Sequence, residues 1–361
     1  MEGETHSKAE VDKRESQLRI VAWEVTRSCN LSCVHCRASS EPGPYAGELN
    51  TGKAIELIDQ IKQVGNPVVI LTGGEPLLRN DVFSLAAYGT KKGLRMVMGS
   101  NGTLITRDVA SRISDSGIKR VSISLDGATS ESHDSFRQVK GAFDMALKGI
   151  RNLKEHGVEF QINTTITRYN LSEAEAVLDL SVRLGAAAHH VFLLVPTGRG
   201  KEILSQGLSA QEYEETLRGF YERKSSVSLE FKATCAPQYY RIMTQESQVK
   251  GERKARTNHG LDAITRGCLA GISYCFISHE GIVQPCGYLE MNAGDLRKAT
   301  LRDIWSNSSI FLNLRDFSKY KGKCGRCEYI AVCGGCRARA YEATGDYLAE
   351  EPLCAYSPLH S

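Results

Sequence analysis

Short apolar runs alternate with amphipathic stretches over residues 18–196. The runs are rich in Val, Ile and Leu, and such short segments predict β-strands. Between them, apolar residues recur at the spacing of one helix face, which predicts helices. The predicted strands are 20–25, 68–71, 95–98, 120–125, 159–165 and 190–195. The predicted helices are 51–64, 82–91, 108–116, 142–156 and 171–184.

A glycine follows each predicted helix, at the position where a left-handed residue often ends a helix. These glycines are Gly65, Gly93, Gly117, Gly157 and Gly185. Successive strand–helix units predict an α/β fold whose strands pair in parallel through right-handed crossovers. The pattern allows an open doubly wound sheet or a partial barrel. No G-x-G-x-x-G motif follows the first strand, which argues against a dinucleotide-binding fold.

Polar and glycine-rich motifs follow most of the predicted strands. In either architecture, functional residues gather at the carboxyl ends of parallel strands. The segments at these ends are 29–36, 72–76, 99–102, 122–127 and 196–201. We therefore expect them to lie together on one rim of the sheet.

The pattern changes after residue 200. A polar helix is expected at 210–223 and a surface loop at 248–259. Eight of the twelve cysteines lie between Cys268 and the end of the chain, among many glycines. This division predicts a flexible tail (1–17), a strand–helix domain (18–205), a helical and irregular connection (206–264) and a cysteine-rich domain (265–361).

Composition narrows the classes of function. The chain has 361 residues, 41% hydrophobic and 24% charged, with a net charge of +3, which is ordinary for a globular protein. It has no long basic run typical of nucleic-acid binders and no apolar run long enough for a membrane span. The polar N-terminus has no signal-peptide core, so we expect a cytoplasmic protein. In that reducing compartment its cysteines are expected to be metal ligands.

Three cysteines follow the first strand at the spacing Cys29-x3-Cys33-x2-Cys36. Thiolates are soft ligands that select iron–sulfur clusters, zinc or copper(I). A cubane cluster usually takes four cysteines, so three leave one iron with an open position. His35 is a conceivable fourth ligand, although its ring is expected to point away inside the tight loop. The alternatives are a zinc knuckle and buried free thiols.

The spacing resembles that of radical S-adenosylmethionine (radical SAM) enzymes, which have a partial (β/α)6 barrel. The resemblance implies a 4Fe–4S cluster whose open iron chelates SAM. Gly73, Gly74 and Glu75, in a G-G-E-P motif, match the family's motif for the amino group of SAM. Ribose and carboxylate contacts would come from four further residues, which alone could equally be turn or capping residues. These are Asn101, Ser122, Asp126 and Arg137.

The C-terminal cysteines resemble the SPASM extension of radical SAM enzymes, which carries auxiliary 4Fe–4S clusters. One cluster would take Cys324, Cys327, Cys333 and Cys354. A second would take Cys268, Cys275, Cys286 and Cys336. In the run from Cys324 to Cys336, two residues separate the last two cysteines, where the family has three. The number of auxiliary clusters, one or two, therefore remains open. The same spacings also occur in zinc ribbons.

Longer segments resemble the haem-biosynthesis branch of radical SAM enzymes. They are 22–29, 33–39, 188–201 and 324–339. The resemblance implies an iron-porphyrin substrate, iron-coproporphyrin III, whose two propionates become vinyl groups of haem b by oxidative decarboxylation. It also implies a low-potential electron donor and an electron acceptor. Substrate contacts would come from His189, His190, Arg199, Lys201 and Cys235, with Tyr239, Tyr240 and Arg241 as further candidates. Cys235 is otherwise a buried free thiol.

Three other functions remain compatible with the sequence. A sister enzyme would act on didecarboxysiroheme or on a haem d1 precursor. A SPASM enzyme that modifies peptides would need a recognition element near the N-terminus, where residues 1–17 offer only a polar tail. A structural or nucleic-acid module that binds zinc is the alternative that is not an enzyme.

Overall fold

A computed structural model describes residues 17–250 and 266–359. The predicted tail (1–17) and the predicted loop (248–259) lie almost entirely outside the described residues. Ten strands form one sheet in the order β10-β9-β8-β1-β2-β3-β4-β5-β6-β7. The strands are β1 (Ile20–Thr26), β2 (Val68–Gly73), β3 (Arg95–Ser100), β4 (Arg120–Ser124), β5 (Glu159–Ile166), β6 (Ala188–Leu193), β7 (Glu230–Thr234), β8 (Tyr274–Ile277), β9 (Ile282–Gln284) and β10 (Gly294–Asp295).

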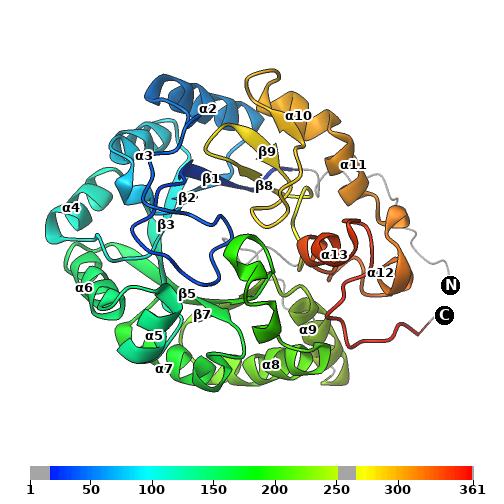
Figure 1. Ribbon diagram of the computed structural model, residues 1–361. Coiled ribbons are helices and arrows are strands. Elements are labelled where there is room, and N and C mark those ends of the chain that lie inside the picture. Colours follow the sequence, from blue (N-terminus) through cyan, green and yellow to red (C-terminus); the bar gives the residue numbers. More distant parts are fainter. Residues whose placement is uncertain (1–16, 251–265, 360–361) are drawn as a thin grey trace.

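Strands β1 to β7 pair in parallel, each with the next along the chain, and curve into an open barrel with helices outside it (Figure 1). The α/β fold and the partial barrel expected from the sequence are confirmed. The parallel sheet also has a seventh strand, β7, in a segment where the sequence predicted only helix and irregular chain. The helices around the barrel are α2 (Thr51–Val64), α3 (Val82–Lys91), α4 (Arg107–Asp115), α5 (Ser130–Arg137), α6 (Ala142–Glu155), α7 (Ala174–Leu184), α8 (Ala210–Arg223) and α9 (Gln238–Val249).

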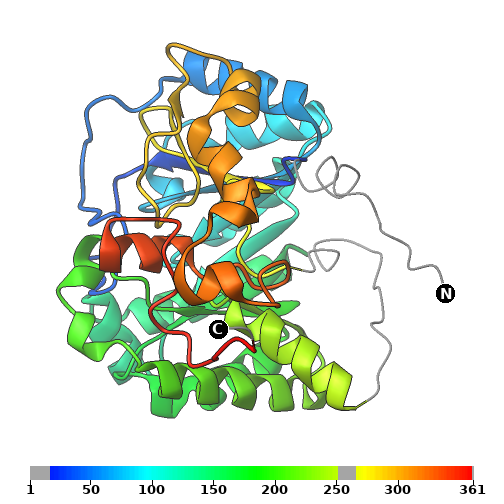
Figure 2. The ribbon, with the colours of Figure 1, turned by 90° about the vertical axis from the view of Figure 1, so that its right-hand side faces the viewer.

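The C-terminal region continues the barrel sheet. β8 pairs in parallel with the outer edge of β1, and β9 and β10 extend that edge as antiparallel strands. The helices α10 (Leu301–Asn307), α11 (Ser309–Arg315), α12 (Gly322–Arg326) and α13 (Arg337–Thr344) follow. Helices α12 and α13 lie on the side where the barrel is open, between β8 and α9, whereas α10 packs against α2 (Figures 1 and 2). The cysteine-rich region therefore packs against both edges of the barrel.

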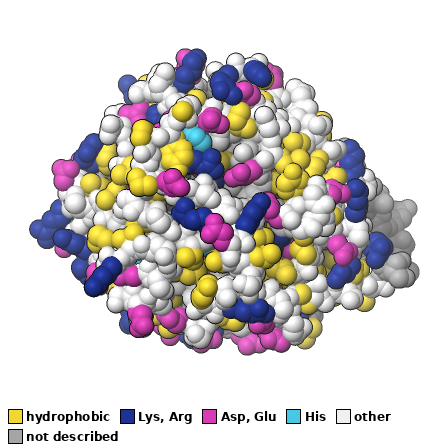
Figure 3. Space-filling view, viewed as in Figure 1, with side chains coloured by type: hydrophobic (Ala, Val, Ile, Leu, Met, Phe, Trp, Pro, Cys, Tyr) yellow, Lys and Arg dark blue, Asp and Glu magenta, His cyan; other side chains and the backbone are white. Residues whose placement is uncertain are grey.

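The core lies between the sheet and the surrounding helices. The larger apolar cluster packs β1 to β5 against α2, α3, α4, α6 and α7 and extends to β8, β9, α10 and α11. A second cluster packs β6 and β7 against α8 and α9. Among the described residues, no helix is long and apolar enough to cross a membrane. On the face seen in Figure 3, positive and negative side chains are interspersed with hydrophobic ones.

Candidate functional site

The loop after β1 brings Cys29, Cys33 and Cys36 together. Cys29 and Cys33 are buried, and they pack with Leu31 and Ala142. Burial raises the pKa of the Cys29 thiol to about 11 and also raises the pKa of Cys33. Such thiols become thiolates when a metal supplies the compensating positive charge. The donor set therefore fits an iron–sulfur cluster with three cysteine ligands.

Each of these sulfurs accepts a hydrogen bond. The backbone N–H of Leu31 donates to Cys29 Sγ and that of Ser40 donates to Cys36 Sγ, each at 3.4 Å. Arg137 Nη1 donates to Cys33 Sγ at 3.4 Å. Hydrogen bonds to ligand sulfurs stabilise thiolate charge and are one determinant of a cluster's reduction potential. The loop is thus arranged for charged sulfurs.

The segment after β6 supports this loop from behind. Arg199 Nε donates to Cys33 O at 2.9 Å and Arg199 Nη1 to Ser40 O at 3.0 Å. Gly198 has a φ of +52°, and a side chain there would overlap the carbonyl oxygens of Cys36 and Arg37. Arg199 was expected to contact substrate, whereas the structure places it on the backbone of the cysteine loop.

The G-G-E-P motif packs against the end of β1. A side chain at Gly73 would overlap Thr26 O, and one at Gly74 would overlap Ser28 O, so both positions require glycine. Glu75 is completely buried, and its carboxylate accepts from Ser100 Oγ at 3.0 Å. It also accepts from the backbone N–H groups of Asn101 and Leu77. Burial raises the pKa of Glu75 to about 7.

The remaining residues expected to contact SAM lie at the same rim. Asn101 Nδ2 donates to Asn30 Oδ1 at 2.9 Å, which links the end of β3 to the cysteine loop. Ser122 faces the interior of the barrel from β4. Asp126 and Arg137 form a buried ion pair, so the Asp126 carboxylate supports the arginine that donates to Cys33.

His35 does not face the other loop ligands. Its ring packs against Phe136 at 4.5 Å between centroids, and its Nε2 lies 3.9 Å from Asp126 Oδ2. Burial lowers the pKa of His35 well below its usual value. This placement agrees with the expectation that the ring points away.

A cavity of about 430 Å³ occupies the barrel interior and extends to the C-terminal cysteines. Its apolar wall includes Ile70, Val97 and Phe192. Its positively charged lining residues are Arg37, Arg95, Arg120, Lys232, Arg266 and Arg337. No Asp or Glu is among the described residues that line it. The volume is within the range of small-molecule sites, and the lining fits a largely apolar ligand that carries several negative charges.

The residues expected to contact substrate are divided between this cavity and other places. His190, Cys235 and Tyr240 line the cavity. His189 points outward from β6, where Thr164 Oγ1 and Ser181 Oγ lie 3.0 and 3.2 Å from its ring nitrogens. Besides Arg199, three more of these residues lie away from the cavity. Lys201 pairs with Glu342 at the surface, Tyr239 packs in the β6–β7 core, and Arg241 pairs with Glu214.

Four C-terminal cysteines line a second, small pocket. They are Cys324, Cys327, Cys333 and Cys354. Among the described residues, no group of three or more His, Cys, Asp or Glu side chains is close enough to bind a single metal ion. These thiols instead surround a common space, and burial raises the pKa of Cys327, Cys333 and Cys354. The four thiols match the ligand set expected for the first auxiliary cluster.

The other expected ligand set is not brought together. Cys268, Cys286 and Cys336 line the large cavity, but Cys275 does not. Cys275 lies on β8, completely buried on the opposite face of the strand, in the apolar core. Alternate residues of a strand point to opposite faces. Tyr274 and Phe276 of β8 face the cavity, so Cys275 between them faces away from it and from the other three cysteines. The prediction that Cys275 belongs to this ligand set is therefore corrected.

Comparison with known proteins agrees with this geometry. The model of the radical SAM superfamily matches residues 23–181, and that of the SPASM iron–sulfur cluster-binding domain matches residues 268–337. An AdoMet-dependent heme synthase of Nitratidesulfovibrio vulgaris is 54% identical over 94% of this chain and 93% of its own length. One of Methanosarcina barkeri is 50% identical over 94% and 97%. The Fe-coproporphyrin III synthase of Methanosarcina barkeri is 32% identical over 93% and 87%.

Solved structures show the same fold. Streptococcus suis SuiB bound to S-adenosylmethionine aligns with a TM-score of 0.73 over 96% of this chain and 80% of that chain, at 17% identity. The enzyme anSMEcpe with bound AdoMet aligns with a TM-score of 0.66 over 92% and 93%, at 19% identity. At these identities the likeness concerns the fold alone.

The fold, the three-cysteine loop and the thiol-lined pocket define a radical SAM enzyme with an auxiliary iron–sulfur domain. Within this superfamily, the chain belongs to the family of the AdoMet-dependent haem synthases. The cofactors expected from the sequence are confirmed: a 4Fe–4S cluster, SAM and an auxiliary cluster. The match of residues 268–337 to an iron–sulfur cluster-binding domain favours iron–sulfur clusters over the zinc-ribbon alternative.

Proposed function

We propose that this enzyme converts two propionate side chains of iron-coproporphyrin III to vinyl groups by oxidative decarboxylation, which yields haem b. The observation that carries the proposal is the charge of the barrel cavity. Six Arg and Lys side chains and no acidic side chain are among its described lining residues. Three of the six, Arg37, Arg120 and Lys232, form ion pairs with Glu24, Glu159 and Glu230, which are not lining residues. A porphyrin with four carboxylates combines a wide apolar ring with the opposite charge. The names of the relatives at 50–54% identity support the same substrate class.

Each conversion transfers one hydrogen atom from the propionate β-carbon to a radical and one electron to an acceptor. It also releases carbon dioxide, which leaves a vinyl group. When bound, SAM and its cluster supply a radical that abstracts hydrogen. The protein positions the propionate near the cysteine loop and keeps water away from the reacting carbon.

Arg37 connects the cysteine loop to the cavity. It follows Cys36 directly, its guanidinium lies 4.5 Å from the Phe276 ring centroid, and its Nη1 donates to Gly287 O at 3.4 Å. It also pairs with the buried Glu24 at 3.4 Å. These contacts fix the position of the Arg37 guanidinium on the wall between the loop and the C-terminal region, with Glu24 as its counter-charge.

Anaerobic turnover tests the proposal. The reconstituted enzyme, incubated with SAM, a low-potential reductant and iron-coproporphyrin III, should give two successive products by mass spectrometry. Each step should remove carbon dioxide and two hydrogens from the neutral acid. SAM cleavage without any change of this porphyrin would contradict the proposal.

Two related substrates serve as comparisons in the same assay. Exclusive turnover of didecarboxysiroheme or of a haem d1 precursor would assign the protein to a sister reaction. Relatives named for these branches are less similar, at 32% and 31% identity. We therefore expect iron-coproporphyrin III to be the substrate that turns over.

A further inference from the structure

Cys235 lies immediately after β7, outside the C-terminal region that contains the other auxiliary cysteines. It lines the central cavity together with Cys268, Cys286 and Cys336. Cys235, Cys286 and Cys336 also belong to one packed cluster of side chains. Burial, and then the charges of Cys286 and Cys336, raise the pKa of the Cys235 thiol. Four thiols from four separate segments therefore surround one part of the cavity.

The register of β8 excludes the cysteine that the spacing would have chosen. Tyr274 and Phe276 line the cavity, so the intervening Cys275 points to the other side of the strand. There it is completely buried in the core with Val283 and Phe311. A change of one position in register would be needed to bring Cys275 to the cavity, and the pairing of β8 with β1 prevents it.

We propose that Cys235, Cys268, Cys286 and Cys336 ligate a second auxiliary 4Fe–4S cluster, in which a cysteine of the barrel takes the place of Cys275. The three C-terminal cysteines at the cavity lack one ligand for a cubane held by four thiolates. Cys235 supplies that ligand from the opposite edge of the sheet. The cluster would then join the barrel to the C-terminal region.

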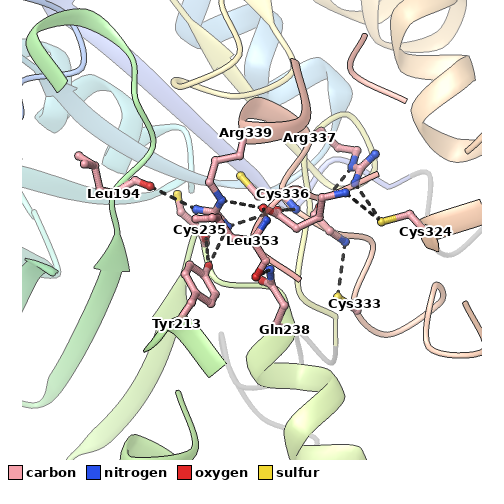
Figure 4. A network of polar contacts seen from close by, with 12 residues as sticks. Leu194, Tyr213, Cys235, Gln238, Cys324, Cys333, Cys336, Arg337, Arg339 and Leu353 are labelled. Carbon is pink, nitrogen blue, oxygen red and sulfur yellow. Dashed lines mark hydrogen bonds and ion pairs between the residues drawn. The ribbon is translucent and has the colours of Figure 1, made fainter. Parts of the chain in front are cut away.

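A buried polar network holds Cys235 and Cys336 in fixed positions relative to each other (Figure 4). The oxygen of Cys235 accepts from Arg339 Nη2 at 2.8 Å and from Tyr213 Oη at 3.0 Å. Arg339 pairs with Glu351, whose Oε2 accepts from the backbone N–H of Cys336. One ion pair thus connects the backbones of two proposed ligands that are about 100 residues apart in the sequence.

The two auxiliary thiol sets are neighbours through Arg337. This residue follows Cys336, lines the large cavity, and donates from Nη2 to Cys324 Sγ at 3.5 Å. Cys324 belongs to the other thiol set. The proposed second cluster therefore lies between the substrate cavity and the first auxiliary cluster. The ligand assignment itself does not depend on the porphyrin, since iron content and spectra report it without substrate.

Metal analysis of paired variants tests the assignment. After anaerobic reconstitution, the full-length enzyme with three cubanes should hold about twelve iron atoms per chain. Cys235→Ala should lose about four of them or, where three thiolates retain the cluster, should change its EPR spectrum and reduction potential. Cys275→Ala is the matched control, and it should keep both the wild-type iron content and the wild-type spectrum.

Two results would overturn the assignment. One is a Cys235→Ala variant with unchanged iron, EPR spectrum and potential. The other is a Cys275→Ala variant that folds, as judged by circular dichroism, and lacks one cluster. If turnover of the porphyrin fails while the iron results hold, the proposed function is at fault and the ligand assignment stands.

Alkylation of the wild-type enzyme decides the question if Cys235→Ala does not fold. Iodoacetamide should label Cys235 much more slowly with the clusters in place than after iron is removed with a chelator, because an iron-bound thiolate is not a free nucleophile. Peptide mass spectrometry reads each cysteine separately. Equal labelling of Cys235 before and after iron removal would refute its role as a ligand.

Discussion

Arg339 Nε donates to Glu351 Oε1 at 2.9 Å, and both side chains are almost completely buried. The pair joins α13 to the chain after it, and through the oxygen of Cys235 it also reaches the end of β7. A buried ion pair of this kind contributes less through its own attraction than through the cost of leaving one partner alone. This makes the pair a sensitive point for stability.

Replacement of Glu351 by Ala should lower the free energy of unfolding by about 3 kcal/mol, because Arg339 would remain buried without its counter-charge. The surface pair of Lys201 and Glu342 provides the control, since the Lys201 side chain is 60% exposed. Lys201→Ala should cost at most about 1 kcal/mol. Anaerobic urea titrations followed by circular dichroism measure both, and equal losses would contradict the argument.

The pKa of Glu75 predicts a pH dependence of stability. Burial raises this pKa from 4.5 to about 7, so the folded state holds a proton that the unfolded state has already released. Stability therefore falls as pH rises from the unfolded pKa through the folded one. Relative to Glu75→Gln, which does not titrate, the wild type should lose about 1 kcal/mol between about pH 6 and about pH 8.

Urea titrations of the metal-free wild type and Glu75→Gln at both pH values measure this difference. The metal-free proteins are used because loss of acid-labile clusters would otherwise contribute to the measured change of stability with pH. A difference between the two proteins that is the same at both pH values would show that the carboxyl is already ionised at pH 6.

The sequence was sufficient to predict most of the barrel and the three-cysteine loop. Hydrophobic periodicity is set by local chain geometry, so five strand–helix repeats could be recognised without tertiary contacts. The segment of β7 was missed because only Phe231 and Ala233 face the core, while Lys232 and Thr234 line the cavity. A strand with a polar inner face looks like irregular surface chain.

The spacing of residues in the sequence could not show to which face of a strand a given side chain points. The His189–His190 pair had to place one ring on each side of β6, but Thr164 and Ser181 determine which one is buried. Cys275 fitted the cysteine pattern, and only the pairing of β8 with β1 shows that it faces away. The sequence predicted a substrate contact for Arg199. Its actual partners are backbone oxygens of a loop more than 150 residues earlier, and no spacing in the sequence indicates them.

Arg199→Ala should weaken the SAM cluster rather than substrate binding. The variant loses both hydrogen bonds to the cysteine loop, so the iron content should fall and SAM cleavage without substrate should decrease several-fold. Lys201→Ala should leave both unchanged. If Arg199 instead contacted the porphyrin, SAM cleavage in the absence of porphyrin would be normal and only product formation would suffer.

Substitutions of the two neighbouring histidines should have different effects, one mainly on protein stability and the other mainly on porphyrin binding. His189→Ala removes a buried ring with two polar neighbours and should cost about 2 kcal/mol of stability, with little change in porphyrin affinity. His190→Ala changes the cavity wall and should weaken porphyrin binding while stability changes less. Thermal unfolding and titration of porphyrin absorbance measure the two effects, and the reverse pattern would contradict the orientation of β6.

The first auxiliary thiol set should be needed for product formation but not for SAM cleavage. Cys327 lines this pocket and is not among the residues that line the cavity, so Cys327→Ala should leave the barrel and the three-cysteine loop intact. Because each decarboxylation releases one electron that must leave the substrate, the variant should cleave SAM at a near-normal rate and form several-fold less vinyl product. Liquid chromatography of 5′-deoxyadenosine and of porphyrins in the same samples gives the ratio. Haem formation at the wild-type ratio would show that the Cys324 set does not carry this electron.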